Sequence, residues 1–600
     1  MNILDILLNN NKKINHEELK YNFKLPIEFQ NSCKEIDPNL ILDLELESFK
    51  NLDLSNLNTN TGDDRIKKNL YYLLFLPNND YEENTISYWN KFYSNDKNFL
   101  IETQYIIENF NTNKFNFSIN DLSLNYDNII NNYNNLISCE NFIDEYDFIS
   151  LPYVDKFNTN ETILQAWIGY NFLSPLINLI IPIISMILPF FIIKIQGYNI
   201  TFETYFIYLK NLLKNHALGN LFCDFKKMSI SNLIYVIITI GLYIYQLYSN
   251  VNSCKKNYVN YIYIMETLNN LKTYLNETLL NMNNFSKLIN SYSTYNEFNS
   301  NLKINISKLE KFGNELEYIK YKDLKSTKNK NFIKMGYFMK YFYNIYNDSD
   351  LVSSLYYSFS FNGYLKNIES IKNYINKNVL NKCSFDNNNT DIKDSCYIGL
   401  LDDSSNNIVK NSIDLNKNIL ISGPNASGKT TVLKSCLFNI LISQQIGYGF
   451  YKSANIKIYD YIHCYINIPD TNERDSLFQA EARKCKTIID SIQKNKNAKH
   501  FCVFDEIFSG TNPSDAIKNG LSYLKYLNKY SNVDYILTTH YNKICKNSDK
   551  KYCENLKMKI KKNKNNIKFT YKIEKGINKI NGGSKILKDL EFPEEIINKN

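Results

Sequence analysis

Residues 423–430 form a glycine-rich octet, Gly-Pro-Asn-Ala-Ser-Gly-Lys-Thr, that matches the pattern G-x-x-x-x-G-K-[ST] once in 600 residues. A short apolar run at 418–422 precedes this octet, and an apolar run at 432–442 follows it. A strand, a glycine loop and a helix in this order surround phosphate oxygens with backbone N–H groups and a helix N-terminus. The octet therefore predicts an α/β P-loop domain in this part of the chain.

Such a loop predicts ATP and Mg²⁺ as ligands. Lys429 is expected to neutralise the β- and γ-phosphates, and the hydroxyl of Thr430 is expected to hold Mg²⁺. The predicted nucleotide-binding residues of the loop are Gly423, Pro424, Asn425, Ala426, Ser427, Gly428, Lys429, Thr430 and Thr431.

Two adjacent carboxylates, Asp505 and Glu506, follow a second apolar run at 500–504. We expect Asp505 to reach Mg²⁺ through its water shell, and Glu506 to orient and deprotonate the water that attacks the γ-phosphate. A third apolar run, at 534–537, leads to His540, which lies where a γ-phosphate sensor is expected. These residues predict a Mg²⁺-dependent ATPase in which Glu506, Lys429 and His540 are catalytic, and in which Thr430 and Asp505 are the metal residues.

Two uncharged runs, 172–193 and 230–248, are each long enough to cross about 30 Å of hydrocarbon. Prolines at 175, 182 and 189 destabilise a soluble helix interior more than a membrane helix, which favours a transmembrane hairpin. A pair of helices buried in a large helical core is the alternative. The lysines between the runs also oppose the positive-inside rule, so the orientation of the hairpin stays open.

The rest of the chain divides by composition and period. Residues 1–170 carry no motif and form an N-terminal region of unknown function, and 171–250 contain the hairpin. We predict a helical core or lever region at 251–382, a linker or insertion loop at 383–396, and the ATPase domain at 397–600. The lever prediction rests on one apolar stripe at helical spacing, which comprises Leu268, Leu271, Leu275, Leu279, Met282, Phe285 and Leu288.

Composition excludes some classes of protein and leaves others open. The net charge of +8 permits contact with nucleic acid or anionic lipid but does not require it. The twelve cysteines contain no C-x-x-C, which argues against a zinc site. No signal sequence is recognised near Met1, so we expect reduced cysteines and an intracellular location, with the ATPase domain on the ATP-containing side of any membrane.

Several motifs together resemble the ATPase domain of the MutS family. They are Gly-Pro-Asn at 423–425, Asp-Glu-Ile at 505–507 followed by Gly510, Thr511 and Asp515, and Thr-His-Tyr at 539–541. Residues 476–481 resemble the S-T-F-x-x-E segment of the family at the start of a helix that runs to about residue 493. An expected hairpin, 557–561 with 567–573, and the segments 582–584 and 592–596 resemble the end of the domain.

The resemblance implies a dimer of ATPase domains, either a homodimer or a MutS-like heterodimer, because the family's counterpart of Ser476 touches the nucleotide of the other subunit. It also implies a DNA partner, in mismatch repair or recombination. The sequence departs from the family at Phe508, where a small residue is usual, at Ala516 and at His500. No Phe-x-Glu lesion-reading motif occurs near the N-terminus, and no helix-turn-helix tail is recognised.

Three functions remain open from the sequence. The first is an ATP-driven clamp on DNA, membrane-associated through the hairpin. The second is a membrane-anchored ATPase that acts on a non-DNA partner, and the third is a nucleotide-dependent structural dimer with little turnover. An ABC transporter ATPase is disfavoured because no LSGGQ segment precedes the acidic strand.

Overall fold

The computed structural model describes most of the chain, and its described residues form two compact units. The described residues are 19, 22–46, 69–78, 80–114, 119–150, 155–213, 230–318, 334–386, 388–401, 408–466, 476–563 and 566–579. Unit 1 comprises Met1–Tyr21, Ser118–Leu279 and Ser307–Leu355, and unit 2 comprises Asn22–Phe117, Leu280–Ile306 and Tyr356–Asn600.

Unit 1 is helical in all of its described residues that have regular structure. Its helices are α7 (Ile119–Ile137), α8 (Phe142–Glu145), α9 (Glu161–Ile195), α10 (Phe202–Leu213) and α15 (Met335–Asn347), with short 3₁₀ turns at Asp155–Thr159 and Leu316–Tyr318. Three further helices, α12 (Ile230–Ile289), α13 (Asn296–Glu315) and α16 (Ser349–Asn376), contribute residues to both units. The helical prediction for 251–382 agrees with these elements up to residue 376, and most of the predicted stripe on α12 is buried.

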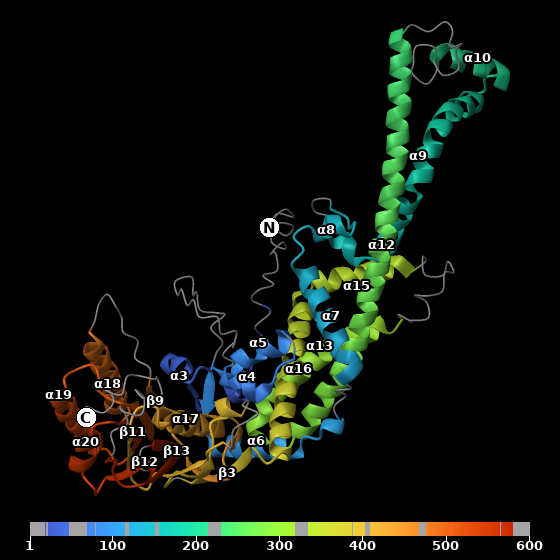
Figure 1. Cartoon of the computed structure of the whole chain (residues 1–600). Helices are drawn as coiled ribbons and strands as arrows, with labels where there is room; N and C mark the ends of the chain where they lie inside the picture. The colour runs from blue at the N-terminus through green and yellow to red at the C-terminus, as the bar shows by residue number, and fades with distance from the viewer. Residues whose placement is uncertain are drawn as a thin grey trace, which may run out of the picture. The chain divides into compact units, whose positions relative to one another are not determined.

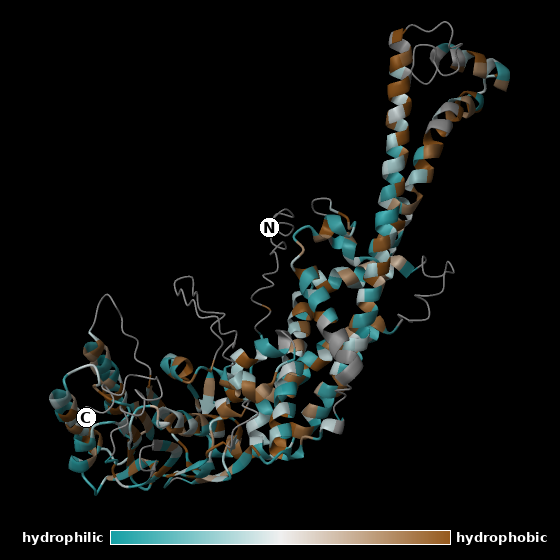
Figure 2. Ribbon diagram, in the orientation of Figure 1, coloured by the Kyte–Doolittle hydropathy of each residue, from teal (hydrophilic) through white to brown (hydrophobic). Residues whose placement is uncertain are grey.

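Both uncharged runs are helical, and with α10 they form a hairpin that projects from the rest of unit 1 (Figure 1). Figure 2 shows hydrophobic residues along the outer parts of α9 and α12. At the base of this hairpin, Asn257 of α12 donates a hydrogen bond to Asp147 at 2.9 Å, and Asn171 of α9 donates to the same carboxylate oxygen. Two stretches in the described residues, Glu161–Ile181 and Leu233–Ile289, are long and apolar enough to cross a membrane.

Unit 2 begins with small elements that lie far from the P-loop in sequence. They are the 3₁₀ turn Pro26–Phe29, β1 (Cys33–Glu35), α3 (Pro38–Asp43), α4 (Leu70–Phe75), α5 (Asp80–Trp89), β2 (Phe92–Ser94), α6 (Lys97–Asn109) and the 3₁₀ turn Thr112–Lys114. Strands β1 and β2 pair in an antiparallel ribbon.

The P-loop region of unit 2 contains two sheets. The first has the strand order β5 (Asn411–Asp414), β4 (Asp391–Ser395), β8 (Ser453–Lys457), β3 (Asn381–Asp386) and β7 (Tyr448–Gly449). The second has the order β13 (Asn566–Lys575), β12 (Cys553–Asn563), β6 (Asn418–Ser422), β11 (Val533–Thr539), β10 (His500–Asp505) and β9 (Tyr461–Tyr465). All neighbours in the second sheet are parallel except β12 and β13.

Helices cover the second sheet. On one face, α18 (Leu477–Lys494) and α19 (Pro513–Leu527) share a core with Leu420, Phe504 and Leu537 from three adjacent strands. Because side chains alternate across a strand, Val503 and Ile536 face the other way, and α17 (Lys429–Ile446) contacts those strands and also β4 and β7 of the first sheet. The short α20 (Asn542–Asn547) follows β11. The carboxyl ends of β6, β10 and β11 therefore meet at one edge of the sheet.

The predicted linker at 383–396 was wrong. This segment contains most of β3 and all of β4, which pair on either side of β8. Its Asn and Asp residues suggested a loop, but the buried side chains of Cys383, Phe385 and Ile392 alternate with polar ones. Alternation with a period of two is typical of a strand with one covered face.

The predicted boundary at residue 170 does not match the compact units either, since residues 22–117 belong to unit 2. Two buried glutamines of α17 hold this segment. Gln444 donates to the carbonyl of Ser94 at 3.0 Å, and Gln445 donates to the carbonyl of Trp89 at 2.8 Å. The N-terminal segment thus supplies backbone acceptors that satisfy the buried amides of the P-loop helix.

Candidate functional site

The predicted P-loop lies between β6 and α17, as its sequence order requires. Ala426 (φ 61°) and Gly428 (φ 94°) adopt left-handed backbone conformations, which turn the loop around the start of the helix. A Cβ atom on Gly423 would lie 2.7 Å from Cγ of Met558, so this position has room only for glycine. The loop therefore forms a tight concave turn of the kind that accommodates an anion.

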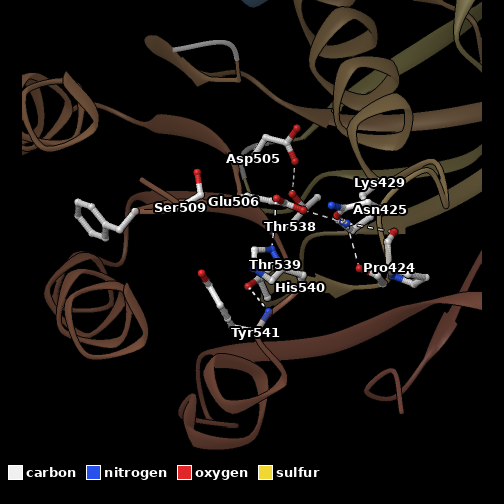
Figure 3. Close-up of polar contacts among 12 residues, drawn as sticks. Pro424, Asn425, Lys429, Asp505, Glu506, Ser509, Thr538, Thr539, His540 and Tyr541 are labelled. Atoms are coloured by element: carbon white, nitrogen blue, oxygen red, sulfur yellow. Dashed lines mark hydrogen bonds and ion pairs between the residues drawn. The ribbon is translucent and has the colours of Figure 1, made fainter. Parts of the chain in front are cut away.

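Lys429 is the first residue of α17, and its ammonium group lies inside this turn (Figure 3). The side chain is only 5% exposed. Its Nζ donates to the carbonyls of Gly423 at 2.9 Å and Pro424 at 3.2 Å, and it pairs with Oε1 of Glu506 at 2.9 Å. The loop and the predicted catalytic base therefore share one cation.

Thr430 and Asp505 meet where a metal ion is expected. The Thr430 hydroxyl donates to Oδ2 of Asp505 at 2.6 Å, and the Thr538 hydroxyl donates to Oδ1 of the same carboxylate. Hydroxyl and carboxylate oxygens are ligands that Mg²⁺ prefers, and the ion usually completes its shell with water and phosphate. The described residues contain no group of three or more His, Cys, Asp or Glu that would hold a metal without such help. The residues present thus fit a Mg²⁺ ion that arrives with a nucleotide.

Glu506 is ionised by its neighbours. His540 Nδ1 lies 3.3 Å from Oε2 of Glu506, opposite the lysine at Oε1 (Figure 3). The hydrogen bond from His540 and then the charge of Lys429 lower the pKa of Glu506 to about 2, against burial, which raises it. Glu506 also has a left-handed backbone (φ 52°) at the end of β10, which directs its side chain toward the loop. A carboxylate that is ionised at neutral pH can accept a proton from water.

The P-loop opens into a cavity of about 860 Å³. Part of its wall is formed by predicted residues of the loop and of the acidic pair, namely Asn425, Ala426, Gly428, Lys429, Thr430, Thr431, Asp505 and Glu506. Aromatic and aliphatic side chains that the sequence analysis did not single out form another part, among them Tyr397, Leu400, Ile408, Val409 and Tyr571. A polar end beside an apolar end suits a ligand that carries both phosphates and a flat base.

Two cavity residues that the sequence did not predict, Tyr571 and Asn411, are placed there by contacts of β13. Tyr571 (φ 58°) comes from β13, and a Cβ on Gly428 would lie 3.0 Å from its ring, so the ring lies against the loop. Asn411 holds this strand by donating to the carbonyl of Tyr571 at 3.0 Å and accepting from the N–H of Ile573 at 2.9 Å. No motif marks these positions. Thr538, in contrast, is opposite Asp505 in the register of β10 and β11, and strand pairing would have found it.

The structure does not bring every predicted residue to this cavity. Ser476 caps the N-terminus of α18, where its hydroxyl accepts from the N–H of Gln479 at 3.4 Å, and it does not line the cavity. The predicted helix from 476 to about 493 and the predicted hairpin at 557–573 are both present. The segments 582–584 and 592–596 lie outside the described residues.

The loop between a strand and a helix, with carboxylates at the end of a neighbouring parallel strand, defines a P-loop nucleotide-binding domain. Residues 419–600 match the model of MutS domain V. Residues 419–600 therefore contain a divergent domain that is similar to domain V of the MutS family.

Relatives in this region are bacterial proteins named DNA mismatch repair protein MutS. The protein of Persephonella marina is 28% identical over 196 residues, which are 32% of this chain and 22% of the relative. The protein of Fusobacterium nucleatum is 29% identical over 201 residues, 33% of this chain and 22% of the relative. That of Prochlorococcus marinus (strain MIT 9312) is 30% identical over 189 residues, 31% of this chain and 20% of the relative. The matched part thus spans about a fifth of each relative's length.

Proposed function

We propose that this chain binds and hydrolyses Mg-ATP and acts as a dimeric, ATP-driven clamp on DNA, with its hairpin associated with a membrane. The observation that carries the ATPase part is the contact of Glu506 with both Lys429 and His540 at the mouth of the P-loop. Retention of labelled ATP by the purified full-length chain, followed by release of phosphate, tests it.

The residues divide the work of hydrolysis. Backbone N–H groups of residues 425–430 and the Lys429 ammonium bind phosphate oxygens, while Thr430 and Asp505 hold Mg²⁺. The bound Mg²⁺ neutralises the charge that develops on the β- and γ-phosphates. Glu506 orients the attacking water as a hydrogen-bond acceptor, since its lowered pKa keeps it ionised, and it takes the proton of that water as the phosphate is attacked. His540 holds Glu506 and senses the γ-phosphate.

The dimer part rests on Ser476. In the family, the counterpart of this residue contacts the nucleotide of the other subunit, and here Ser476 lies outside its own chain's cavity. We propose that two chains, or this chain and a MutS-like partner, each complete the other's site. Light scattering with and without ATP on the Glu506→Gln protein measures this association.

DNA is the proposed partner because the relatives are named as DNA mismatch repair proteins. If the clamp acts on DNA, duplex DNA raises the ATPase rate, and the effect falls steeply with added salt because phosphate contacts release counterions. An ATPase rate that is independent of duplex DNA at low salt contradicts this proposal.

The hairpin favours a second candidate, a membrane-anchored ATPase that acts on a non-DNA partner. Its apolar side chains are exposed rather than packed against protein, among them Leu176, Leu188, Ile237, Leu242 and Tyr245. Soluble proteins seldom expose such a continuous apolar surface to water, whereas a lipid bilayer would cover it. On this view, lipid vesicles change the ATPase rate and duplex DNA does not.

The proposed location can be tested by cell fractionation and protease treatment. We propose an intracellular protein with its ATPase domain on the ATP-containing side, so carbonate-washed membranes from cells should retain it and proteases outside intact cells should spare the domain.

A structural dimer with little turnover is the third candidate, which Phe508 suggests. A chain that binds ATP and dimerises, but releases no phosphate over many hours, would favour that alternative.

A further inference from the structure

The three residues 508–510, which follow the Asp505–Glu506 pair closely, all contact the first turns of α18. The ring of Phe508 lies 5.8 Å from the ring of Phe478. Gly510 packs so closely on Leu477 that an added Cβ would lie 2.7 Å from its Cγ atom. The loop after the predicted base is therefore in direct contact with the helix that begins at Leu477, just after Ser476.

Glu481 adds a polar contact to this apolar one. Its carboxylate is 2% exposed and accepts from the N–H of Ser509 at 3.0 Å, from the hydroxyl of Ser509 at 2.9 Å and from the N–H of Gly510 at 3.2 Å. A buried carboxylate loses its hydration, so these donors are what stabilise its charge. Moving the loop away from α18 would leave that charge without them.

Phe508 holds the backbone of the same loop in place. It has a left-handed conformation (φ 56°), which is uncommon for a large side chain, and its ring is buried between Phe478 and Tyr523 of α19. The N–H of Phe508 donates to the hydroxyl of Tyr465 at 3.3 Å. The contact between the rings of Phe508 and Phe478 therefore adds an aromatic link between the loop and α18.

We propose that Phe508 and Glu481 are positioning residues that make the loop 507–510 and the start of α18 move as one body. The state of the γ-phosphate at Glu506 then sets the position of Ser476, and so reaches the nucleotide bound by a second copy of the chain. This inference rests on the proposed function, since it adds a route of communication to the proposed dimeric ATPase. Bistable packed elements transmit small shifts in this way.

The test compares nucleotide affinity with ATP-driven dimerisation in full-length protein in detergent. In the Glu506→Gln background, which holds ATP unhydrolysed, we add Glu481→Gln or Phe508→Ala, and as a matched control Asp490→Asn, an exposed carboxylate on the same helix. We expect Glu481→Gln and Phe508→Ala to change the Kd for labelled ATP by less than about twofold but to weaken dimerisation by about tenfold, a usual coupling factor. Asp490→Asn should change neither.

Rescue separates positioning from general stability. Phe508→Leu keeps an apolar side chain at the contact and should restore most of the dimerisation, and thermal melts check that each variant folds. If Phe508→Ala does not fold, the nearly isosteric Glu481→Gln decides the question. Unchanged dimerisation in Glu481→Gln overturns the inference, as does a parent protein that binds ATP without dimerising. A parent that does not bind ATP at all instead refutes the proposed function.

Discussion

Two helices of this protein are apolar around most of their circumference, yet their surroundings differ. In α17, every side chain from Ser435 to Ile446 is buried between two sheets and the N-terminal segment of unit 2. In the outer part of α12, side chains such as Ile234, Ile238 and Leu242 are exposed. A helix that is apolar all round is either a core helix or a membrane span, and only its covering tells the two apart.

The polar residues of the two helices show the same difference. In α17, the amides of Asn439, Gln444 and Gln445 are buried and donate to backbone carbonyls of neighbouring elements. In the outer part of α12, Thr239 donates to the carbonyl of Tyr235 in its own helix. Buried amides that need partners from other elements thus identify a protein core, because each unsatisfied amide would cost free energy. A span in lipid satisfies its polar groups internally.

The largest expected effect concerns the P-loop region, where α17 is covered by protein. Glu506→Gln, at the sheet edge next to α17, removes the proposed base, so kcat should fall by about 10²–10⁴ while ATP stays bound. Phosphate release and nucleotide retention measure the two effects. Glu554→Gln, which removes a half-buried carboxylate of β12 that pairs with Lys575 of β13, is the control and should not change kcat. If the Glu506→Gln protein hydrolyses ATP at the parental rate, Glu506 is not the base.

The next effect compares two lysines of α17, one at the P-loop and one about a turn further along the helix. Lys429→Ala removes a buried cation that bridges the loop and Glu506, and we expect the Kd for ATP to rise about a hundredfold, since hydrogen bonds to charged groups contribute strongly. Lys434→Ala removes a lysine one turn further along the same helix, which pairs with Glu45, and should leave the Kd unchanged. Equal losses in both variants would mean that the helix, and not the loop, was damaged.

A charge on the exposed helix tests whether lipid covers it. Ile238→Lys places an ammonium in the middle of the uncharged run, which costs about 3 kcal/mol in a bilayer, so vesicle binding should weaken by about a hundredfold. Leu280→Lys on the same α12 is the control, because Leu280 is exposed but lies outside the uncharged run. Flotation with vesicles measures the difference. If both variants float as the parent does, the hairpin is not a lipid anchor.

The smallest effect concerns the pH dependence of stability in the covered region. The pKa of Glu506 is lowered from 4.5 to about 2, so its ion pair stabilises the folded chain above pH 4.5, and this contribution disappears as the pH falls toward 2. At pH 6, the parent should melt about 2 °C above the Glu506→Gln protein, and the difference should shrink at pH 4 and again at pH 3. A difference that grows on acidification would show that Glu506 is not paired in the free protein.

Much of the site follows from local sequence. The strand β6, the loop and the start of α17 were predicted from one octet and its flanking apolar runs, and the strand before Asp505 from the mostly apolar run at 500–504. The segment 383–396 was misread because its polar residues are those of a loop, although Phe385 and Ile392 alternate with them. Tyr571 and Asn411 were missed because they reach the cavity from strands more than 150 residues apart in sequence.

The sequence by itself determined which residues stand at the carboxyl ends of β6 and β10, because a phosphate loop needs particular residues at fixed spacing. It also determined which helices are apolar. Only the tertiary structure decided that α17 is covered by protein while the outer α12 is exposed, and that Phe508 and Glu481 join the loop after Glu506 to α18. Contacts of this kind depend on residues brought together from distant parts of the chain, for which local patterns contain no signal.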